Sequence, residues 1–177
     1  MDNLKIKRAL LIILDGVGVG PSGENNGWTL ANTPNIDLLL KDYPSTVIEA
    51  SGESVGLPKG QMGNSEVGHM ILGSGTIFKQ DLVIINEAIA DSSFFNNEAI
   101  LNAILSVKKN NSKLHLLGLA SPGGVHSHIN HLISILKMCK SYGVSPKLHL
   151  FTDGRDADPK SSIEIFDDLD KYLKEYG

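Results

Sequence analysis

Two short apolar stretches, residues 113–119 and 146–152, stand on either side of an amphipathic segment. Each stretch has the length and composition of a strand. The segment between them, residues 127–142, follows a helical period and carries four apolar side chains on one face: Ile129, Leu132, Ile133 and Leu136. A strand, a helix and a second strand in this order form a βαβ unit with parallel strands. The sequence therefore predicts an α/β fold with a mostly parallel sheet flanked by helices.

A continuous apolar run at residues 9–14 ends at Asp15 and a glycine-rich loop. The run predicts a strand that is buried on both faces, and residues 46–50 predict another short strand. Ligands of parallel sheets gather beyond the carboxyl ends of the strands, where a carboxylate offers hard oxygen ligands to a divalent cation. Asp15 is therefore either a metal ligand or an ordinary turn residue before Gly16.

Four glycines punctuate residues 56–69, whose sequence is Gly-Leu-Pro-Lys-Gly-Gln-Met-Gly-Asn-Ser-Glu-Val-Gly-His. The apolar residues that follow Ser65 predict a short helix with Ser65 in its first turn. Unpaired backbone N–H groups and the helix dipole favour an anion such as phosphate at that place. The alternative is that Asn64 or Ser65 only caps the helix. Local spacing leaves both interpretations open.

Polar residues also follow the two strands of the predicted βαβ unit. The first strand is followed by Gly-Gly-Val-His-Ser-His, residues 123–128, and the second by Asp-Gly-Arg-Asp, residues 153–156. Arg155 has a planar guanidinium suited to carboxylate or phosphate oxygens, and Asp156 either binds a substrate hydroxyl or orients the arginine. The alternative is a turn in which Arg155 and Asp156 only pair with each other. Three histidines near the first strand suggest a metal site, although no carboxylate accompanies them: His126, His128 and His131.

The charge balance makes nucleic acid an unexpected partner. The chain has 16 basic and 20 acidic residues, a formal net charge of −4, and no large basic cluster. Its single cysteine, Cys139, rules out an internal disulfide and suits helix packing in a reducing compartment. No stretch approaches the ~20 apolar residues of a membrane span. We therefore expect a cytoplasmic protein that contacts neither nucleic acid nor membrane.

The block around Ser65 closely resembles the signature of the cofactor-independent, or 2,3-bisphosphoglycerate-independent, phosphoglycerate mutases of the alkaline-phosphatase superfamily. The resemblance implies a metal-dependent isomerase of glycolysis and gluconeogenesis, which interconverts 3-phosphoglycerate and 2-phosphoglycerate through a phosphoserine intermediate. It assigns the nucleophile to Ser65, which also binds metal, and a metal-binding carboxylate to Asp15. The implied cofactors are two divalent metal ions, with Mn²⁺ as the expected metal, and no 2,3-bisphosphoglycerate.

The resemblance extends to the two polar clusters at the strand ends. Members of the family have Gly-Gly-Val-His-Ser-His and Asp-Gly-Arg-Asp at these places, so the resemblance implies that His126, Arg155 and Asp156 bind the phosphoglycerate substrate. It covers essentially the whole chain but only the first part of the family pattern. Residues 1–77 are thereby expected to be the first segment of a metal-dependent phosphatase-type domain, and residues 78–177 to be part of a substrate-binding transferase domain.

The later part of the family pattern contains further metal ligands, a phosphate-binding lysine and more arginines. The resemblance therefore implies an alkaline-phosphatase-like fold that is incomplete in this chain. We expect the chain alone to be inactive or nearly so, and to require the missing C-terminal portion as its partner. Two alternatives stay open: a non-catalytic phosphoglycerate-binding module, and a related metal-dependent phosphatase that acts on a different ester.

Overall fold

The structure, a computed structural model, describes residues 8–176 of the chain. Its contacts divide the chain into two units, residues 1–49 and 50–177. The second unit holds the sheet and four of the five predicted site residues: Ser65, His126, Arg155 and Asp156. This unit is therefore the part of the chain that positions most of the candidate site.

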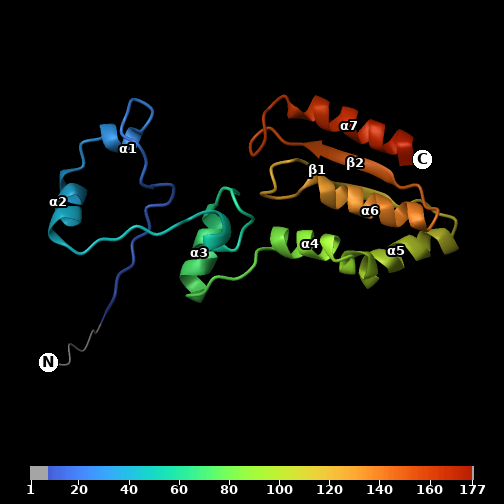
Figure 1. Cartoon of the computed structure of the whole chain (residues 1–177), viewed down its shortest axis with the longest axis horizontal. Coiled ribbons are helices and arrows are strands. Elements are labelled where there is room, and N and C mark those ends of the chain that lie inside the picture. Colours follow the sequence, from blue (N-terminus) through green and yellow to red (C-terminus); the bar gives the residue numbers. More distant parts are fainter. Residues whose placement is uncertain (1–7, 177) are drawn as a thin grey trace. The chain divides into compact units, whose positions relative to one another are not determined.

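The sheet of the second unit consists of β1 (His115–Ala120) and β2 (Lys147–Thr152), which pair in parallel. Helix α6 (Ile129–Ser141) connects the two strands, and α6 and α7 (Ser161–Tyr176) lie alongside them (Figure 1). The register sets Ala120 opposite Thr152, so the residues that follow both strands leave the sheet at the same edge. The predicted βαβ unit and the α/β class are confirmed.

The core of the second unit lies between α5 (Glu98–Lys109) and α6. At its centre are three side chains that are at most 2% exposed: Ile104, Met138 and Cys139. Phe94 and Phe95 of the short 3₁₀ helix η2 (Ser93–Asn96) pack against this cluster. Cys139 thus has the packing role predicted for it, and burial raises the pKa of its thiol.

Replacing Ile104 by alanine is expected to lower the free energy of unfolding by about 2–5 kcal/mol, because its fully buried side chain would leave a cavity in close-packed surroundings. Urea unfolding followed by circular dichroism measures the loss. Leu105 is the matched control: it is the next residue of α5 and is 45% exposed, so alanine there should cost about 1 kcal/mol or less. Equal losses at the two positions would contradict this description of the core.

The loop that carries the serine motif is closed by backbone hydrogen bonds. It begins at the 3₁₀ helix η1 (Gly52–Val55) and ends at α3 (Ser65–Ser74). The N–H of Gly52 donates to the carbonyl of Gln61 (2.9 Å), and the N–H of Gln80, just before α4 (Asp81–Ala90), donates to the carbonyl of Gly56 (2.9 Å). A small apolar cluster supports the loop: Val55, Leu57 and Val67. These contacts hold the start of α3 in place.

Helix α7 packs on the βαβ unit through a narrow apolar stripe. Leu169 is 5% exposed, whereas Ile163 is 67% exposed. Side chains of α6, β2 and α7 together line a cavity of about 170 Å³ that includes Leu136, Leu148 and Leu173. Although α7 has 16 residues, neither it nor any other helix in the described part of the chain is long and apolar enough to cross a membrane.

The first unit contains the short helices α1 (Gly27–Leu30) and α2 (Pro34–Asp42), and its described residues, 8–49, include no strand. The strands predicted at residues 9–14 and 46–50 are therefore wrong. Leu10, Leu11 and Ile12, which were expected to be buried on both faces, are 71–84% exposed. A strand forms only when a neighbouring strand takes up its backbone hydrogen bonds, and the described part of this unit offers no such neighbour.

Candidate active site

Ser65 is the first residue of α3 and is exposed. The helix is capped by the preceding residue: the side-chain oxygen of Asn64 accepts a hydrogen bond from the N–H of Val67 (3.0 Å). The hydroxyl of Ser65 therefore stands in the first turn, as predicted, without having to act as the cap itself. Backbone N–H groups and the positive end of the helix dipole lie beside it, an arrangement that favours a negatively charged group.

His69, one helical turn after Ser65, lies against the serine. Its Nδ1 atom is 2.8 Å from the Ser65 carbonyl oxygen and 3.2 Å from Ser65 Oγ. A carbonyl oxygen only accepts hydrogen bonds, so Nδ1 carries a proton in this geometry. Nδ1 of His69 is therefore a donor beside the hydroxyl and not a base that removes its proton. The spacing of four residues on one helix face is the sequence signal for this contact.

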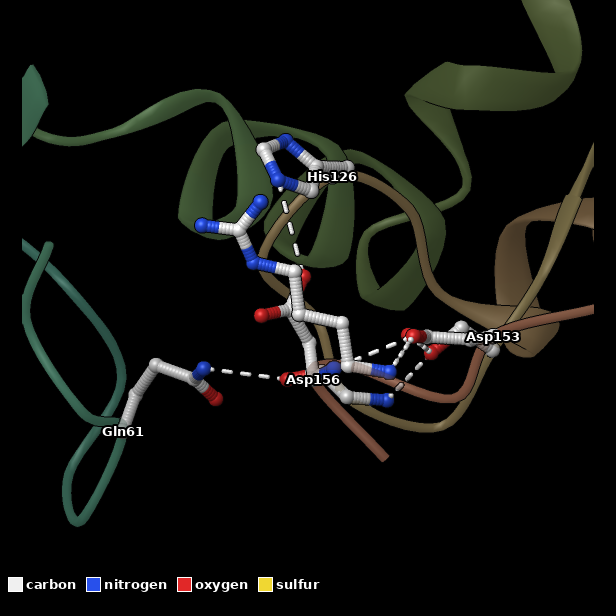
Figure 2. A network of polar contacts seen from close by, with 7 residues as sticks. Gln61, His126, Asp153 and Asp156 are labelled. Atoms are coloured by element: carbon white, nitrogen blue, oxygen red, sulfur yellow. Dashed lines mark hydrogen bonds and ion pairs between the residues drawn. The ribbon is translucent and has the colours of Figure 1, made fainter. Parts of the chain in front are cut away.

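A buried pair of side chains joins the ends of the two strands. Ser121 directly follows β1 and Asp153 directly follows β2, and the Ser121 hydroxyl donates to Oδ2 of Asp153 (2.6 Å). The other carboxylate oxygen, Oδ1, accepts the backbone N–H groups of Arg155 (2.9 Å) and Asp156 (3.0 Å) (Figure 2). These bonds, with that of Ser121 the strongest, lower the pKa of Asp153 to about 2. Neither Ser121 nor Asp153 is among the residues predicted from the sequence to belong to the site.

The three residues predicted to bind substrate, His126, Arg155 and Asp156, lie in the two loops that the Ser121–Asp153 pair connects. His126 Nε2 lies 3.5 Å from Oδ2 of Asp156, and Arg155 is the exposed neighbour of Asp156 in the same loop. Figure 2 shows the imidazole of His126 facing the carboxylate of Asp156. The backbone of Gly123 approaches the carbonyl of Asp156 so closely that a Cβ atom on Gly123 would lie 2.7 Å from that oxygen. The loops after β1 and β2 are thus packed against each other, and they bring three of the predicted site residues together.

One long-range contact links this cluster to the serine loop. The side-chain amide of Gln61 donates to the carbonyl oxygen of Gly123 (3.0 Å), although the two residues are 62 positions apart (Figure 2). Gln61 belongs to the motif that contains Ser65, and Gly123 opens the loop that contains His126. The motif spacing gave no signal for this pairing, because only the tertiary fold brings the two loops together.

The other histidines of the first cluster have structural partners. His128 caps α6 by accepting the N–H of Asn130 (3.2 Å), and Nε2 of His131 lies 2.9 Å from the side-chain oxygen of Asn86. Burial, and to a smaller extent nearby His128, lowers the pKa of His131. Within residues 8–176 no three His, Cys, Asp or Glu side chains are grouped so as to hold a metal ion. This arrangement does not support a metal site built from the three histidines.

Asp15 belongs to the first unit and sits in a tight turn. The N–H of Val17 donates to the carbonyl of Leu14 (3.2 Å), and Gly16 has a positive φ of 79°, which glycine adopts without strain. The turn predicted as the alternative for Asp15 is therefore present. The turn does not decide between the two interpretations, so the metal-ligand role of Asp15 stays a prediction.

Residues 85–177, more than half of the chain, match the family described as BPG-independent PGAM N-terminus. The chain belongs to this family. A mutase of this family from Onion yellows phytoplasma (strain OY-M), named 2,3-bisphosphoglycerate-independent phosphoglycerate mutase, is 54% identical over 164 residues, which are 92% of this chain and 32% of the relative. One of the same name from Clostridium botulinum (strain ATCC 19397 / Type A) is 51% identical over 172 residues, which are 97% of this chain and 34% of the relative.

Among solved structures, the chain is similar to the Leishmania mexicana phosphoglycerate mutase determined at low cobalt concentration. The TM-score is 0.85 at 35% sequence identity, over 93% of this chain and 30% of the solved one. The chain thus spans about one third of the length of the mutases it matches. These findings confirm the predicted family and an α/β fold that is partial in this chain. The predicted domain boundary at residue 77 stays a prediction, although the family match lies wholly on its C-terminal side.

Proposed function

We propose that this chain supplies the N-terminal third of an enzyme that interconverts 3-phosphoglycerate and 2-phosphoglycerate through a phosphoserine at Ser65. The observation that carries the proposal is the hydrogen bond between the loop that contains Ser65 and the loop that contains His126, both in the second unit. An exposed serine at the start of α3 belongs to a loop whose Gln61 hydrogen-bonds the loop that carries His126. This contact supports the proposal, because it connects the loop of the proposed nucleophile to the candidate substrate-binding cluster.

The reaction would transfer the phosphoryl group twice. Oγ of Ser65 attacks phosphorus, the bond from phosphorus to one glycerate oxygen breaks, and that oxygen takes up the proton that the serine hydroxyl loses. The second glycerate hydroxyl then attacks the phosphoserine, and the proton returns to Ser65. The N–H groups at the start of α3 stabilise the added negative charge. Arg155, Asp156 and His126 hold the glycerate between the two steps.

The oxygen donors of Asp15 and Ser65 suit hard divalent cations such as Mn²⁺, of which we propose two per site. When bound, these ions lower the pKa of the serine hydroxyl and neutralise charge on the transferred group. Two donors do not complete the coordination sphere of such an ion. We therefore propose that a partner corresponding to the remaining two thirds of the relatives' length provides the other ligands, and that the chain alone is inactive. We also propose that the enzyme works in the cytoplasm.

The test uses a chimera in which this chain replaces the matched third of the Clostridium botulinum relative. With Mn²⁺ and 3-phosphoglycerate, we expect turnover without added 2,3-bisphosphoglycerate, and acid-quenched samples should contain one phosphoryl group on the peptide with Ser65. Turnover that never labels this peptide would contradict the phosphoserine route.

Calorimetric titration of the chain with 3-phosphoglycerate, with and without Mn²⁺, tests the binding-module alternative. Binding that does not need metal, together with an inactive chimera, would favour that module.

A further inference from the structure

Asp153 is a charged residue that the proposed reaction does not use, yet it is 8% exposed and both of its carboxylate oxygens accept hydrogen bonds. We propose that Asp153, fixed by Ser121, is a positioning residue that holds Arg155 and Asp156 in the geometry that binds phosphoglycerate. The proposal rests on the substrate-binding role given to these two residues above. In this proposal the buried carboxylate of Asp153 fixes the backbone of the loop that carries Arg155 and Asp156.

The position of the pair follows from the sheet. Ala120 and Thr152 are partners in the parallel register, so the next residue of each strand, Ser121 and Asp153, leaves the sheet at the same edge. The hydroxyl of Ser121, which is 1% exposed, reaches Asp153 at 2.6 Å. Because the register of two hydrogen-bonded strands is fixed, this contact is preorganised before any ligand arrives.

Ser121 also organises the loop that carries His126. Its hydroxyl oxygen accepts the N–H of Gly123 (3.0 Å), and its carbonyl accepts the N–H of Ile129 (2.8 Å), the first residue of α6. Both ends of the loop between β1 and α6 are therefore attached to Ser121. One buried serine and one buried aspartate thus connect the two loops that carry the candidate substrate cluster.

The direction of the hydrogen bonds shows why Asp153 positions and does not bind the substrate. An ionised carboxylate only accepts hydrogen bonds, and both oxygens of Asp153 already accept them from groups of the protein itself. Asp153 is turned inward to backbone N–H groups, which leaves the side chains of Arg155 and Asp156 for the ligand. Its pKa of about 2 keeps it ionised at neutral pH. The stabilisation it provides is present above the ordinary value of 3.8 and is lost as the pH falls through about 2.

The test compares Ser121→Ala with Ser134→Ala in the full 177-residue chain. Ser134 is the matched control, because it is 3% exposed and its hydroxyl donates to a backbone carbonyl of α6 (2.8 Å) that takes no part in either loop. The amide NMR signals of Arg155 and Asp156 report the ionisation of Asp153. We expect S121A to move their titration midpoint upward from about 2, because the strongest bond to the carboxylate is lost, and S134A to leave it unchanged.

A second variant, Asp153→Asn, and a second measurement, the affinity for 3-phosphoglycerate, test the same proposal independently. Asp153→Asn should abolish this titration at both amides, and S121A and D153N should each weaken binding of 3-phosphoglycerate about ten-fold in calorimetry, with S134A unchanged. An unmoved midpoint in S121A, or binding of 3-phosphoglycerate with the same measurable affinity by all four proteins, would overturn the proposal. If the midpoint moves but the unaltered chain binds no 3-phosphoglycerate, the positioning of the loop is supported and the substrate assignment of the proposed function fails.

Discussion

The chimera with alanine in place of Ser65 is expected to lose mutase turnover by at least about four orders of magnitude. Oγ of Ser65 is the atom that takes the phosphoryl group in the proposed reaction, and alanine has no atom that can replace it. The exposed position of Ser65 at the start of α3, after a cap already provided by Asn64, means that the substitution should leave the helix intact. A coupled assay of 2-phosphoglycerate formation measures the loss.

Ser74 provides the control for this experiment, since it is the last residue of the same helix and its hydroxyl contacts only backbone groups near the helix end: it donates to the carbonyl of Thr76 (2.9 Å) and accepts the N–H of Thr76 (3.3 Å). Ser74→Ala should retain turnover within about two-fold, as expected of a substitution at the surface. Binding of 3-phosphoglycerate should survive in the Ser65 variant, because His126, Arg155 and Asp156 are unchanged. Turnover above about one hundredth of the unaltered chimera in the Ser65 variant would remove Ser65 from the chemistry.

Gly63→Ala is expected to destabilise the serine loop by about 3 kcal/mol or more, the largest stability effect we predict for this loop. A Cβ atom on Gly63 would lie 1.8 Å from the carbonyl oxygen of Ala50, and neither group is the end of a side chain that can turn aside. The backbone must therefore shift, and with it the start of α3 two residues later. Urea unfolding of the chain and turnover of the chimera should both be impaired.

Gly68→Ala is the matched control for Gly63→Ala. Gly68 lies inside α3, and a Cβ atom there would meet no heavy atom within 4 Å. Alanine is the better helix former, so this variant should be more stable than the original by about 0.5–1 kcal/mol. If Gly63→Ala unfolds at the same urea concentration as Gly68→Ala, the close approach of residues 50 and 63 is not a constraint on the loop.

Most of the second unit could be predicted because its signals are local. The apolar periods of residues 113–152 gave the strand, helix and strand in their correct order, and the serine motif gave a helix with Ser65 in its first turn. The run at residues 9–14 misled for a definite reason. Its apolar composition favours burial, but these residues are exposed. A strand is buried only where other strands pair with its edges and other elements cover its faces, and the composition of the run does not say whether such neighbours are present.

The candidate site also contains residues that could be predicted from the sequence and one that was not. The resemblance to the family implied the roles of His126, Arg155 and Asp156, whose motifs lie directly after predicted strands, and the fold brings these residues together. The role of Asp153, the first residue of its motif, was not predicted. A signal for it did exist: an acidic residue at the first position of Asp-Gly-Arg-Asp can accept the N–H groups two and three residues later, as Asp153 does.

The sequence by itself determined those features that depend on residues a few positions apart. These are the cap at Asn64, the turn at Gly16, the helical periods and the order of elements in the βαβ unit, because their hydrogen bonds close within one turn. Only the tertiary structure decided which apolar runs are buried and which distant loops meet. Ser121 reaches Asp153 across 32 positions, and Gln61 reaches Gly123 across 62, because the register of two parallel strands and the packing of two loops set those distances.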